Sequence, residues 1–361
     1  MKIWKRVTLL FLGLMLLAAA PLPAQGAEVT DTAGRKVQVP ANPKRIVCLG
    51  PGCLRLIVYL QAQDKVVGIE SMEQRRGGRP YILAQPQLLS LPQVSPGGPS
   101  GINKKPDLEG ILKVKPDLVF ITYMQADKAD DVQKLLGVPV VVLTYGRFAA
   151  FDKAVYDSLR IAGKILGKDK RAQEVIAFME AGQKDLRQRV AQVKKDQKPK
   201  VYVGGIGFRG SHGIESTDSR YIPFTWLEAQ AVVKPRKGRG HAFLDKEDLL
   251  RLRPDVIFLD GGGLHLIKAD YGKKPKYYRS IEAFKQKRVY TLFPYNWYTT
   301  NLGTTLADAY CIGKILYPQC FTGMDTVKKT NEIYTYLVAK PVYDQMVEFY
   351  GPLGKRPPFL K

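Results

Sequence analysis

A long stretch of the chain, from Lys168 to Val193, has hydrophobic residues at a helical period. Apolar residues recur every seven positions at Ala172, Met179, Leu186 and Val193, and Val175, Ile176 and Val190 fall on the same side. Charged residues fill most of the other positions. This pattern predicts one amphipathic helix, which would extend roughly 39 Å at about 1.5 Å per residue. An ordinary surface helix has the same pattern, so the role of this one depends on what lies on either side of it.

One pattern occurs on both sides of this helix. Residues 107–121, DLEGILKVKPDLVFI, align without a gap on residues 245–259, DKEDLLRLRPDVIFL. Each copy predicts a short helix that runs through a Pro-Asp turn into a buried strand. The flanking pieces also correspond in order, RIVCLG with KVYVGG and VPVVVLTYG with RVYTLFPY. A repeat of this extent predicts two similar α/β lobes joined by the long helix.

The first half contains a strand-helix-strand pattern. An apolar strand at Arg45 to Leu49 leads through a Gly-Pro-Gly turn into a helix that begins at Cys53, and a second strand follows at Lys65 to Ile69. Such units impose parallel strands and place ligands at the carboxyl ends of the strands. We therefore expect two Rossmann-like lobes with a ligand cleft between them.

The same pattern gives the expected boundaries of the parts. We expect the first lobe over residues 27–151, the connecting helices over 152–199, and the second lobe with its terminal helices over 200–361. Helices predicted at 302–316 and 324–340 should pack back across the second lobe.

The first 26 residues differ from the rest of the chain. Three basic residues precede an apolar run that ends at Ala20, and small residues follow at Ala24 and Gly26. This composition is typical of a cleaved export signal, and the apolar run is short for the alternative, a membrane anchor. We therefore expect a soluble periplasmic protein with a cleaved signal peptide over residues 1–26.

Export changes what the charge and the cysteines imply. The formal charge of +23 falls by three to +20 when Lys2, Lys5 and Arg6 leave with the signal. Such a surplus suits nucleic acid, an acidic membrane surface or an anionic ligand, and export argues against nucleic acid. In an oxidising compartment the cysteines can pair, but the sequence does not fix which of them do so. They are Cys48, Cys53, Cys311 and Cys320.

Several of these stretches together resemble one family. They are VTDTAGRKVQVPANPKRIV, CLGPGCLRLIVYL followed by DKVVGIE, the KPDLVFI and RPDVIFL repeats, and the long central helix. The chain resembles the substrate-binding proteins of ABC importers for iron-siderophore complexes, haem and cobalamin, a class that also includes molybdate and tungstate binders. The resemblance implies a monomeric protein, without a cofactor of its own, that holds its ligand between two lobes and delivers it to a permease and an ATPase.

One position departs from that family. Members commonly carry a glutamate on the helix after the first strand, and this glutamate docks onto permease arginines. Here the matching position is Arg55, and the second-lobe counterpart, Glu228, is a loose match. Either the permease has altered charges or a neighbour such as Glu70 takes this role.

In this architecture the loops after the strands face the cleft, so candidate ligand contacts can be taken from them. All three histidines of the chain fall among these loops in the second lobe. The candidates are Gly52, Cys53, Arg75, Arg76, Tyr123, Tyr145, Arg147, Arg209, His212, Arg239, His241, His265, Tyr295, Trp297 and Tyr298.

These residue types point to an anionic ligand that is aromatic or macrocyclic. Arginine forks match carboxylates, catecholates and oxyanions, and tyrosine and tryptophan offer flat apolar faces with polar tips. Acidic residues are scarce in these loops, which argues against a bare divalent cation. His212, His241 or His265 would still suit a metal already held by a chelator, because imidazole binds iron and cobalt well. For molybdate, Arg, Ser and backbone N–H groups would act instead.

Three functions compete on these observations. The leading hypothesis is a binding protein that delivers an iron complex, and the alternative is a receptor for molybdate or tungstate. A metal chelatase would also use clefted histidines, but no nucleophile-base pair, phosphate loop or nucleotide fingerprint is present in the sequence. The stretch GGIGFRG has suitable glycines without the downstream acidic residue that a dinucleotide site needs. We therefore expect a binding protein and not an enzyme.

Overall fold

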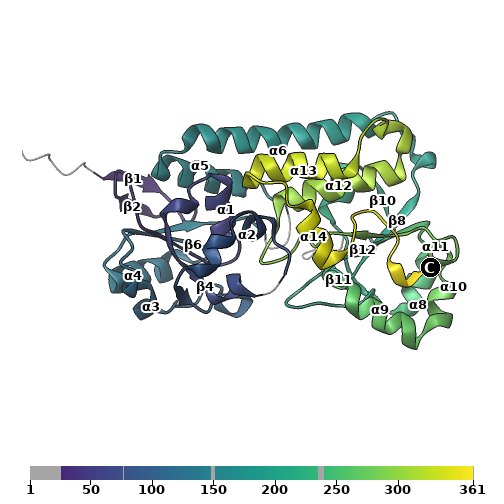
Figure 1. The fold of residues 1–361 in the computed structure, drawn as a ribbon, viewed down its shortest axis with the longest axis horizontal. Helices are drawn as coiled ribbons and strands as arrows, with labels where there is room; N and C mark the ends of the chain where they lie inside the picture. The colour runs from purple at the N-terminus through teal and green to yellow at the C-terminus, as the bar shows by residue number, and fades with distance from the viewer. Residues whose placement is uncertain (1–25, 76, 148–150, 235–239, 361) are drawn as a thin grey trace, which may run out of the picture.

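The computed structural model describes residues 26–75, 77–147, 151–234 and 240–360. Two α/β lobes lie side by side, and one long helix runs along the same edge of both (Figure 1). This arrangement confirms the predicted fold class. The predicted signal peptide lies outside the described residues except for Gly26.

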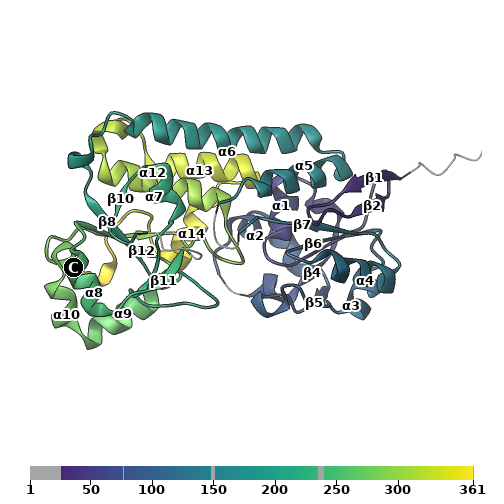
Figure 2. The same cartoon turned by 180° about the vertical axis from the view of Figure 1, so that it is seen from behind.

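The first lobe is built on a parallel sheet with the strand order β5-β4-β3-β6-β7. Seen from behind, β4, β5, β6 and β7 lie together below α5 (Ala154–Leu166) (Figure 2). The strands are β3 (Ile46–Leu49), β4 (Val66–Glu70), β5 (Gln93–Ser95), β6 (Leu118–Thr122) and β7 (Val140–Leu143), and an antiparallel hairpin, β1 (Ala27–Thr30) and β2 (Lys36–Val39), precedes them. The helices of this lobe are α1 (Cys53–Tyr59), α2 (Pro80–Ala84), α3 (Leu108–Lys113) and α4 (Ala126–Leu136).

The second lobe repeats this plan on a smaller parallel sheet, with the order β10-β8-β12-β13. Its strands are β8 (Lys200–Gly204), β10 (Gln230–Ala231), β12 (Val256–Asp260) and β13 (Val289–Leu292), and β9 (Ser216–Asp218) pairs with β11 (His241–Phe243) in a separate antiparallel ribbon. Its helices are α7 (Ile222–Trp226), α8 (Lys246–Leu252), α9 (Leu264–Lys273), α10 (Pro275–Ser280), α11 (Glu282–Lys285), α12 (Leu302–Leu316), α13 (Thr326–Val338) and α14 (Tyr343–Tyr350). The two copies of the repeat form α3 with β6 and α8 with β12, as predicted.

The connection between the lobes consists of α5 (Ala154–Leu166) and α6 (Asp169–Val190). Gly167 adopts a left-handed conformation that ends α5 and lets the chain reverse into α6. The seven-residue apolar positions of α6 are buried. One hydrophobic core extends from Ile57 of α1 through Met179 of α6 to Leu306 of α12. The central helix is therefore packed against both lobes.

The last two long helices also reach the first lobe. Helix α13 packs against α1 and α2, and the Gln85 side chain donates to the Val338 carbonyl oxygen at 3.3 Å. The Tyr350 hydroxyl of α14 donates to the Gly78 carbonyl oxygen at 3.2 Å. The expectation that the terminal helices pack on the second lobe is therefore incomplete, because their apolar faces also cover the first lobe. Helices α13 and α14 therefore form a second, non-covalent link between the lobes.

Two further sequence questions concern the membrane and the cysteines. Within the described ranges, none of the helices combines the length and the apolar character needed to span a membrane. All four cysteines are free thiols, and Cys48, Cys53 and Cys311 are buried.

Candidate functional site

The lobes meet where the first-lobe strands end and the chain leaves β13. Tyr123, which follows β6, shares a hydrogen bond of 3.2 Å with the Thr299 hydroxyl. Gly52 packs closely against two side chains, because a Cβ added to it would lie 2.7 Å from both Thr299 and Tyr145. The sequence therefore identified both sides of this contact, with Gly52, Tyr123 and Tyr145 from one lobe and the residues around Tyr298 from the other.

Arg55 lies inside the protein at this contact. Its guanidinium donates to the carbonyl oxygens of Trp297 at 2.9 Å, of Tyr298 at 3.1 Å and of Thr300 at 2.8 Å. The side chain is fully buried, whereas a residue that docks onto a permease must be exposed. This corrects the expectation that Arg55 is a docking residue, because a segment of the second lobe covers it.

Tyr298 links the two lobes a second time. Its hydroxyl donates to Glu70 Oε2 at 2.5 Å and accepts from the Gly98 backbone N–H at 3.0 Å. Glu70 Oε1 accepts from the Gly50 backbone N–H at 2.9 Å. Burial raises the pKa of Glu70 to about 7, although its hydrogen bonds to Tyr298 and Gly50 lower it. Glu70 is buried and bonded, so it is not available for docking either.

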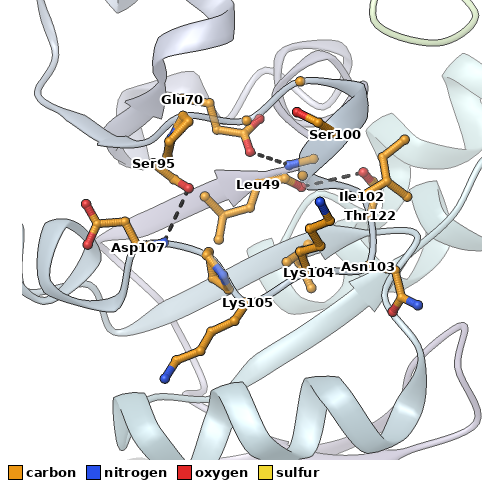
Figure 3. A pocket seen from close by; sticks show the side chains of 17 residues that line it. Leu49, Glu70, Ser95, Ser100, Ile102, Asn103, Lys104, Lys105, Asp107 and Thr122 are labelled. Carbon is orange, nitrogen blue, oxygen red and sulfur yellow. Dashed lines mark hydrogen bonds between the residues drawn. The ribbon is translucent and has the colours of Figure 1, made fainter. Parts of the chain in front are cut away.

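A cavity of about 410 Å³ opens at the carboxyl ends of β3, β4 and β6 (Figure 3). The connections after the parallel neighbours β3 and β6 lead to opposite sides of the sheet, to β4 and to β7. This is the switch point at which parallel sheets hold ligands. Figure 3 shows Lys104 directed toward this space and Lys105 directed away from it. The polar side chains that line the cavity are Glu70, Ser95, Ser100, Asn103, Lys104, Lys105, Asp107 and Thr122.

The sequence placed a glycine-rich loop at this cavity but missed its lysines. Lys104 follows SPGGPSGIN directly, and a basic residue after a glycine-rich loop was the signal that could have found it. Glu70 was named only as a docking residue, because the end of β4 gave no indication that its side chain would turn inward.

The second lobe carries a cluster of aromatic and imidazole rings near the lobe contact. The His241 ring stacks on Phe208 with centroids 4.2 Å apart, and both histidine rings of the cluster contact Phe243 edge-on. His212 and His241 are 6.4 Å apart between centroids, and the Arg209 guanidinium lies 5.8 Å from the Phe208 ring centre. The loop is held toward the lobe contact by Asn296, whose side chain donates to the Gly207 carbonyl oxygen. We call these five residues, Phe208, Arg209, His212, His241 and Phe243, the histidine cluster.

Hydrogen bonds fix which ring nitrogens of the histidines remain open. His212 Nε2 lies 2.7 Å from the Phe208 carbonyl oxygen, which can only accept, so Nε2 carries the proton. The Ser216 hydroxyl donates to the Ile206 carbonyl oxygen and therefore accepts from His241 Nε2 at 2.8 Å. In this arrangement both Nδ1 atoms are left to accept a hydrogen bond or to bind a metal. Burial, with His212 nearby, lowers the pKa of His241 to about 4, so this ring is neutral at pH 7.

Other predicted site residues lie elsewhere. Arg75, Arg147 and His265 are exposed, and none of them has a side-chain contact with the histidine cluster among the described interactions. Arg76 and Arg239 fall outside the described residues.

Two predicted residues are part of the core. Tyr295 is fully buried against Tyr221, with ring centroids 5.3 Å apart. Cys53 is also fully buried, and desolvation raises the pKa of its thiol. A buried thiol with a raised pKa is unreactive, so Cys53 acts in packing.

Trp297 and Glu228 are both at least partly accessible to solvent. Trp297 is half-buried beside Gly77, whose added Cβ would lie 3.2 Å from the indole, and its buried Nε1 has no hydrogen-bond partner. Glu228 is exposed and pairs with Lys198 at 3.5 Å, so it remains accessible to a partner.

Comparison with known proteins agrees with this architecture. The model of the periplasmic binding protein family matches residues 46–295. The molybdate-binding protein MolA of Haemophilus influenzae is 25% identical over 329 residues, which cover 85% of this chain and 89% of that protein. The petrobactin-binding protein YclQ of Bacillus subtilis is 23% identical, over 83% of this chain and 94% of that protein.

Solved structures share the fold at lower identity. Haemophilus influenzae MolA bound to molybdate has a TM-score of 0.67 and 22% identity, covering 87% of this chain and 98% of that chain. A periplasmic solute binding protein from Veillonella parvula has a TM-score of 0.70 and 21% identity, covering 90% of this chain and 96% of that chain. Both likenesses extend over the two lobes and the helices that connect them.

Proposed function

The chain belongs to the periplasmic binding protein family, and from this premise we propose that it captures an anionic metal chelate between its lobes. An iron complex is the leading ligand, and the protein would deliver it to the permease and ATPase of an ABC importer. The observation that carries this proposal is the histidine cluster.

The histidine cluster combines three properties that a metal chelate needs. Phe208 and Phe243 offer flat apolar faces, and the Phe243 side chain is 54% exposed although it is large and apolar. His212 and His241 each keep an open Nδ1, which would complete the coordination of iron held by a chelator. Arg209 adds a positive charge that suits a carboxylate or catecholate ligand.

Arg55 supports a negative charge on the ligand. Its hydrogen bonds go to carbonyl oxygens and to the Tyr145 hydroxyl, which are neutral groups. The nearby Glu73 carboxylate is paired with Arg79 at 3.5 Å, so no carboxylate forms a direct ion pair with Arg55 among the described residues. A buried cation raises the local potential most strongly where water is excluded. An anion between the lobes would therefore be favoured over a neutral or cationic molecule.

The test is a ligand screen on the protein from Ala27 onward. Thermal unfolding would be followed with ferric siderophores, haemin, cobalamin, molybdate and tungstate, and any hit would be titrated by calorimetry. Stabilisation by a coloured chelate that is lost in His212→Ala and His241→Ala would support the proposal. Stabilisation by no chelate in the panel, with a positive response to an oxyanion, would reject it.

Molybdate or tungstate is the second candidate, and the first-lobe cavity favours it. The cavity of about 410 Å³ is lined by Lys104, two serine hydroxyls and glycine backbone, which suit a small tetrahedral anion. Its lining also includes the carboxyl groups of Asp107 and of Glu70, whose pKa burial raises to about 7. Haemophilus influenzae MolA, which matches most of this chain, is a molybdate-binding protein. For this candidate, Lys104→Ala should weaken binding and His241→Ala should not.

Further parts of the proposal concern the protein as a whole. We propose a monomer that is exported by a cleaved signal over residues 1–26 and that acts without catalysis. We also propose lobe boundaries at 27–151 and 200–361, with 152–199 as the connection. Docking onto the permease would use Glu228 of the second lobe, which is exposed, together with surface residues of the first lobe.

A further inference from the structure

We propose that Arg55 is the positioning residue of the ligand cleft. It holds the second-lobe segment Trp297–Thr300 against the first lobe, so that this edge of the cleft is closed before a ligand arrives. The inference rests on the proposed function only in taking the space between the lobes as the ligand site.

The first support is the convergence of backbone carbonyl groups on one side chain. Nη1 donates to Thr300, and Nη2 donates to both Trp297 and Tyr298. Successive carbonyls of an extended strand point in opposite directions, so three of them rarely reach one guanidinium. Here Tyr298 and Thr299 both have positive φ, at 52° and 64°, which is unfavourable for residues with a side chain. The contact with Arg55 offsets this local strain.

The second support is that the guanidinium is itself held in place. Its central carbon lies 5.0 Å from the centre of the Tyr81 ring and 5.8 Å from that of Tyr145. Tyr145 in turn donates to the Gly52 carbonyl oxygen at 2.9 Å, at the start of the helix that carries Arg55. A planar donor fixed between two rings can hold the segment in one geometry.

The third support is that the same segment presents the aromatic residues predicted to meet the ligand. Tyr298 reaches Glu70 and Gly98 across the contact, and Trp297 lies beside Gly77. If Arg55 is lost, all three carbonyl oxygens lose its N–H groups, and the Trp297 oxygen keeps the Asn301 side chain as a donor at 3.2 Å. Both aromatic side chains then lose most of their backbone support. Arg55 would therefore act on the ligand through Trp297 and Tyr298, without touching it.

Arg171, which is partly buried and pairs with Glu174 at 3.7 Å, shows that this role is not shared by every arginine that donates to backbone carbonyl groups. Its guanidinium also donates to two carbonyl oxygens, those of Tyr59 and Tyr336, and lies 4.8 Å from the Tyr336 ring centre. These partners lie on α1 and α13, at the packed side of the lobes and away from the Trp297–Thr300 segment. Arg171 is therefore a matched control with the same chemistry.

Trp297 provides a readout that needs no ligand. Trp226 and Trp297 are the two tryptophans after residue 26, so a Trp226→Phe background leaves Trp297 as the single tryptophan of the protein from Ala27 onward. Excitation at the long-wavelength edge of its absorption band avoids the tyrosines. In this background we expect Arg55→Met to raise the acrylamide quenching constant of Trp297 by about twofold or more, because the segment opens locally. Arg55→Lys, which keeps the charge but cannot reach three carbonyl oxygens at once, should restore part of the difference.

Arg171→Met should lower the unfolding temperature and leave Trp297 quenching unchanged. The proposal is overturned if Arg55→Met folds and quenching does not change, or if Arg171→Met changes it equally. If Arg55→Met does not fold, Arg55→Lys replaces it in this test, since lysine preserves the charge and most of the volume. An Arg55→Lys variant with the same Trp297 quenching constant as its Trp226→Phe parent would then overturn the proposal. A quenching change without binding of any chelate or oxyanion would reject the proposed function and leave this inference intact.

Discussion

Arg55 Nη1 donates to the carbonyl oxygen of Thr300 at 2.8 Å, across 245 positions of the sequence. The donor belongs to the helix after the first strand, and the acceptor belongs to the segment that leads into α12. Both groups are buried, so water cannot replace either partner if the other is removed. The contact between the lobes therefore depends on a polar side chain in the interior as well as on apolar packing.

Removal of this side chain should destabilise the protein strongly. Arg55→Met removes N–H donors from the buried carbonyl oxygens of Tyr298 and Thr300 and one of two donors from that of Trp297, while keeping most of the volume. We expect a loss of about 2–4 kcal/mol in the free energy of unfolding. Urea unfolding followed by circular dichroism measures it. Arg75→Ala, at an exposed position, is the control and should change stability by less than about 0.5 kcal/mol. Equal stability of both variants would show that the carbonyl groups find other donors.

Gly52 should be intolerant of a side chain for two separable reasons. Its φ of 77° is unfavourable for alanine, and the added Cβ would lie 2.7 Å from Thr299 and from Tyr145. We expect Gly52→Ala to cost about 2–4 kcal/mol, from backbone strain and overpacking together. Gly137→Ala has a φ of 63° and no atom within 4 Å, so it should cost only about 1 kcal/mol. Urea unfolding of both variants separates the two effects, and equal losses would contradict the predicted clash.

The fold could be predicted from the sequence because its signals are local and repeated. The apolar positions of residues 168–193 and the repeat at 107–121 and 245–259 fixed the central helix and both sheets without knowledge of any contact. The strand β5 and the short helices between β12 and β13 were not predicted. They are brief and lack a clear period, so their conformation depends on packing against the sheets.

The site was predicted only in part, since its contacts join residues far apart in the chain. Loops after strands led to Tyr123, which lies at the lobe contact, and to His212 and His241 of the histidine cluster. Their contact with a ligand stays a prediction. Nothing near Arg55 in the sequence indicates that residues 297–300 will cover it, and the family comparison suggested a surface role. His265 lies in the first turn of α9, which begins at Leu264, and it is exposed and outside the histidine cluster. Its predicted role at the ligand stays a prediction.

Glu70 should make stability depend on pH. Its pKa is about 7 in the folded protein against 4.5 as the ordinary value, because of burial. The folded state therefore binds the proton more tightly, and this contribution to stability is full below about pH 4.5 and is lost as the pH rises through 7. The loss is at most about 3 kcal/mol. In Glu70→Gln, which cannot titrate, we expect the fall in stability between pH 5 and 8 to be smaller by this amount.

Urea unfolding at several pH values measures this difference. Asp218 and Asp260, with pKa values raised by burial to about 6 and about 8, add slopes of the same sign in every variant. The comparison with Glu70→Gln cancels their effect, and Glu109→Gln, at an exposed position on α3, is the matched control. Parallel pH curves for Glu70→Gln and the unmodified protein would show that Glu70 does not hold a raised pKa.

His241 should contribute to chelate binding over a wide pH range. Its Nε2–H is held by Ser216 and its pKa is lowered to about 4, so Nδ1 keeps its lone pair at any pH well above 4. We expect His241→Ala to weaken binding of a ferric chelate at least tenfold, or by about 1.4 kcal/mol. His265→Ala, at an exposed position on α9, should leave the affinity unchanged. Calorimetric titration between pH 5 and 8 tests both statements. A tenfold loss of affinity in His265→Ala, or no loss of affinity in His241→Ala, would show that His241 is not the residue that binds the metal.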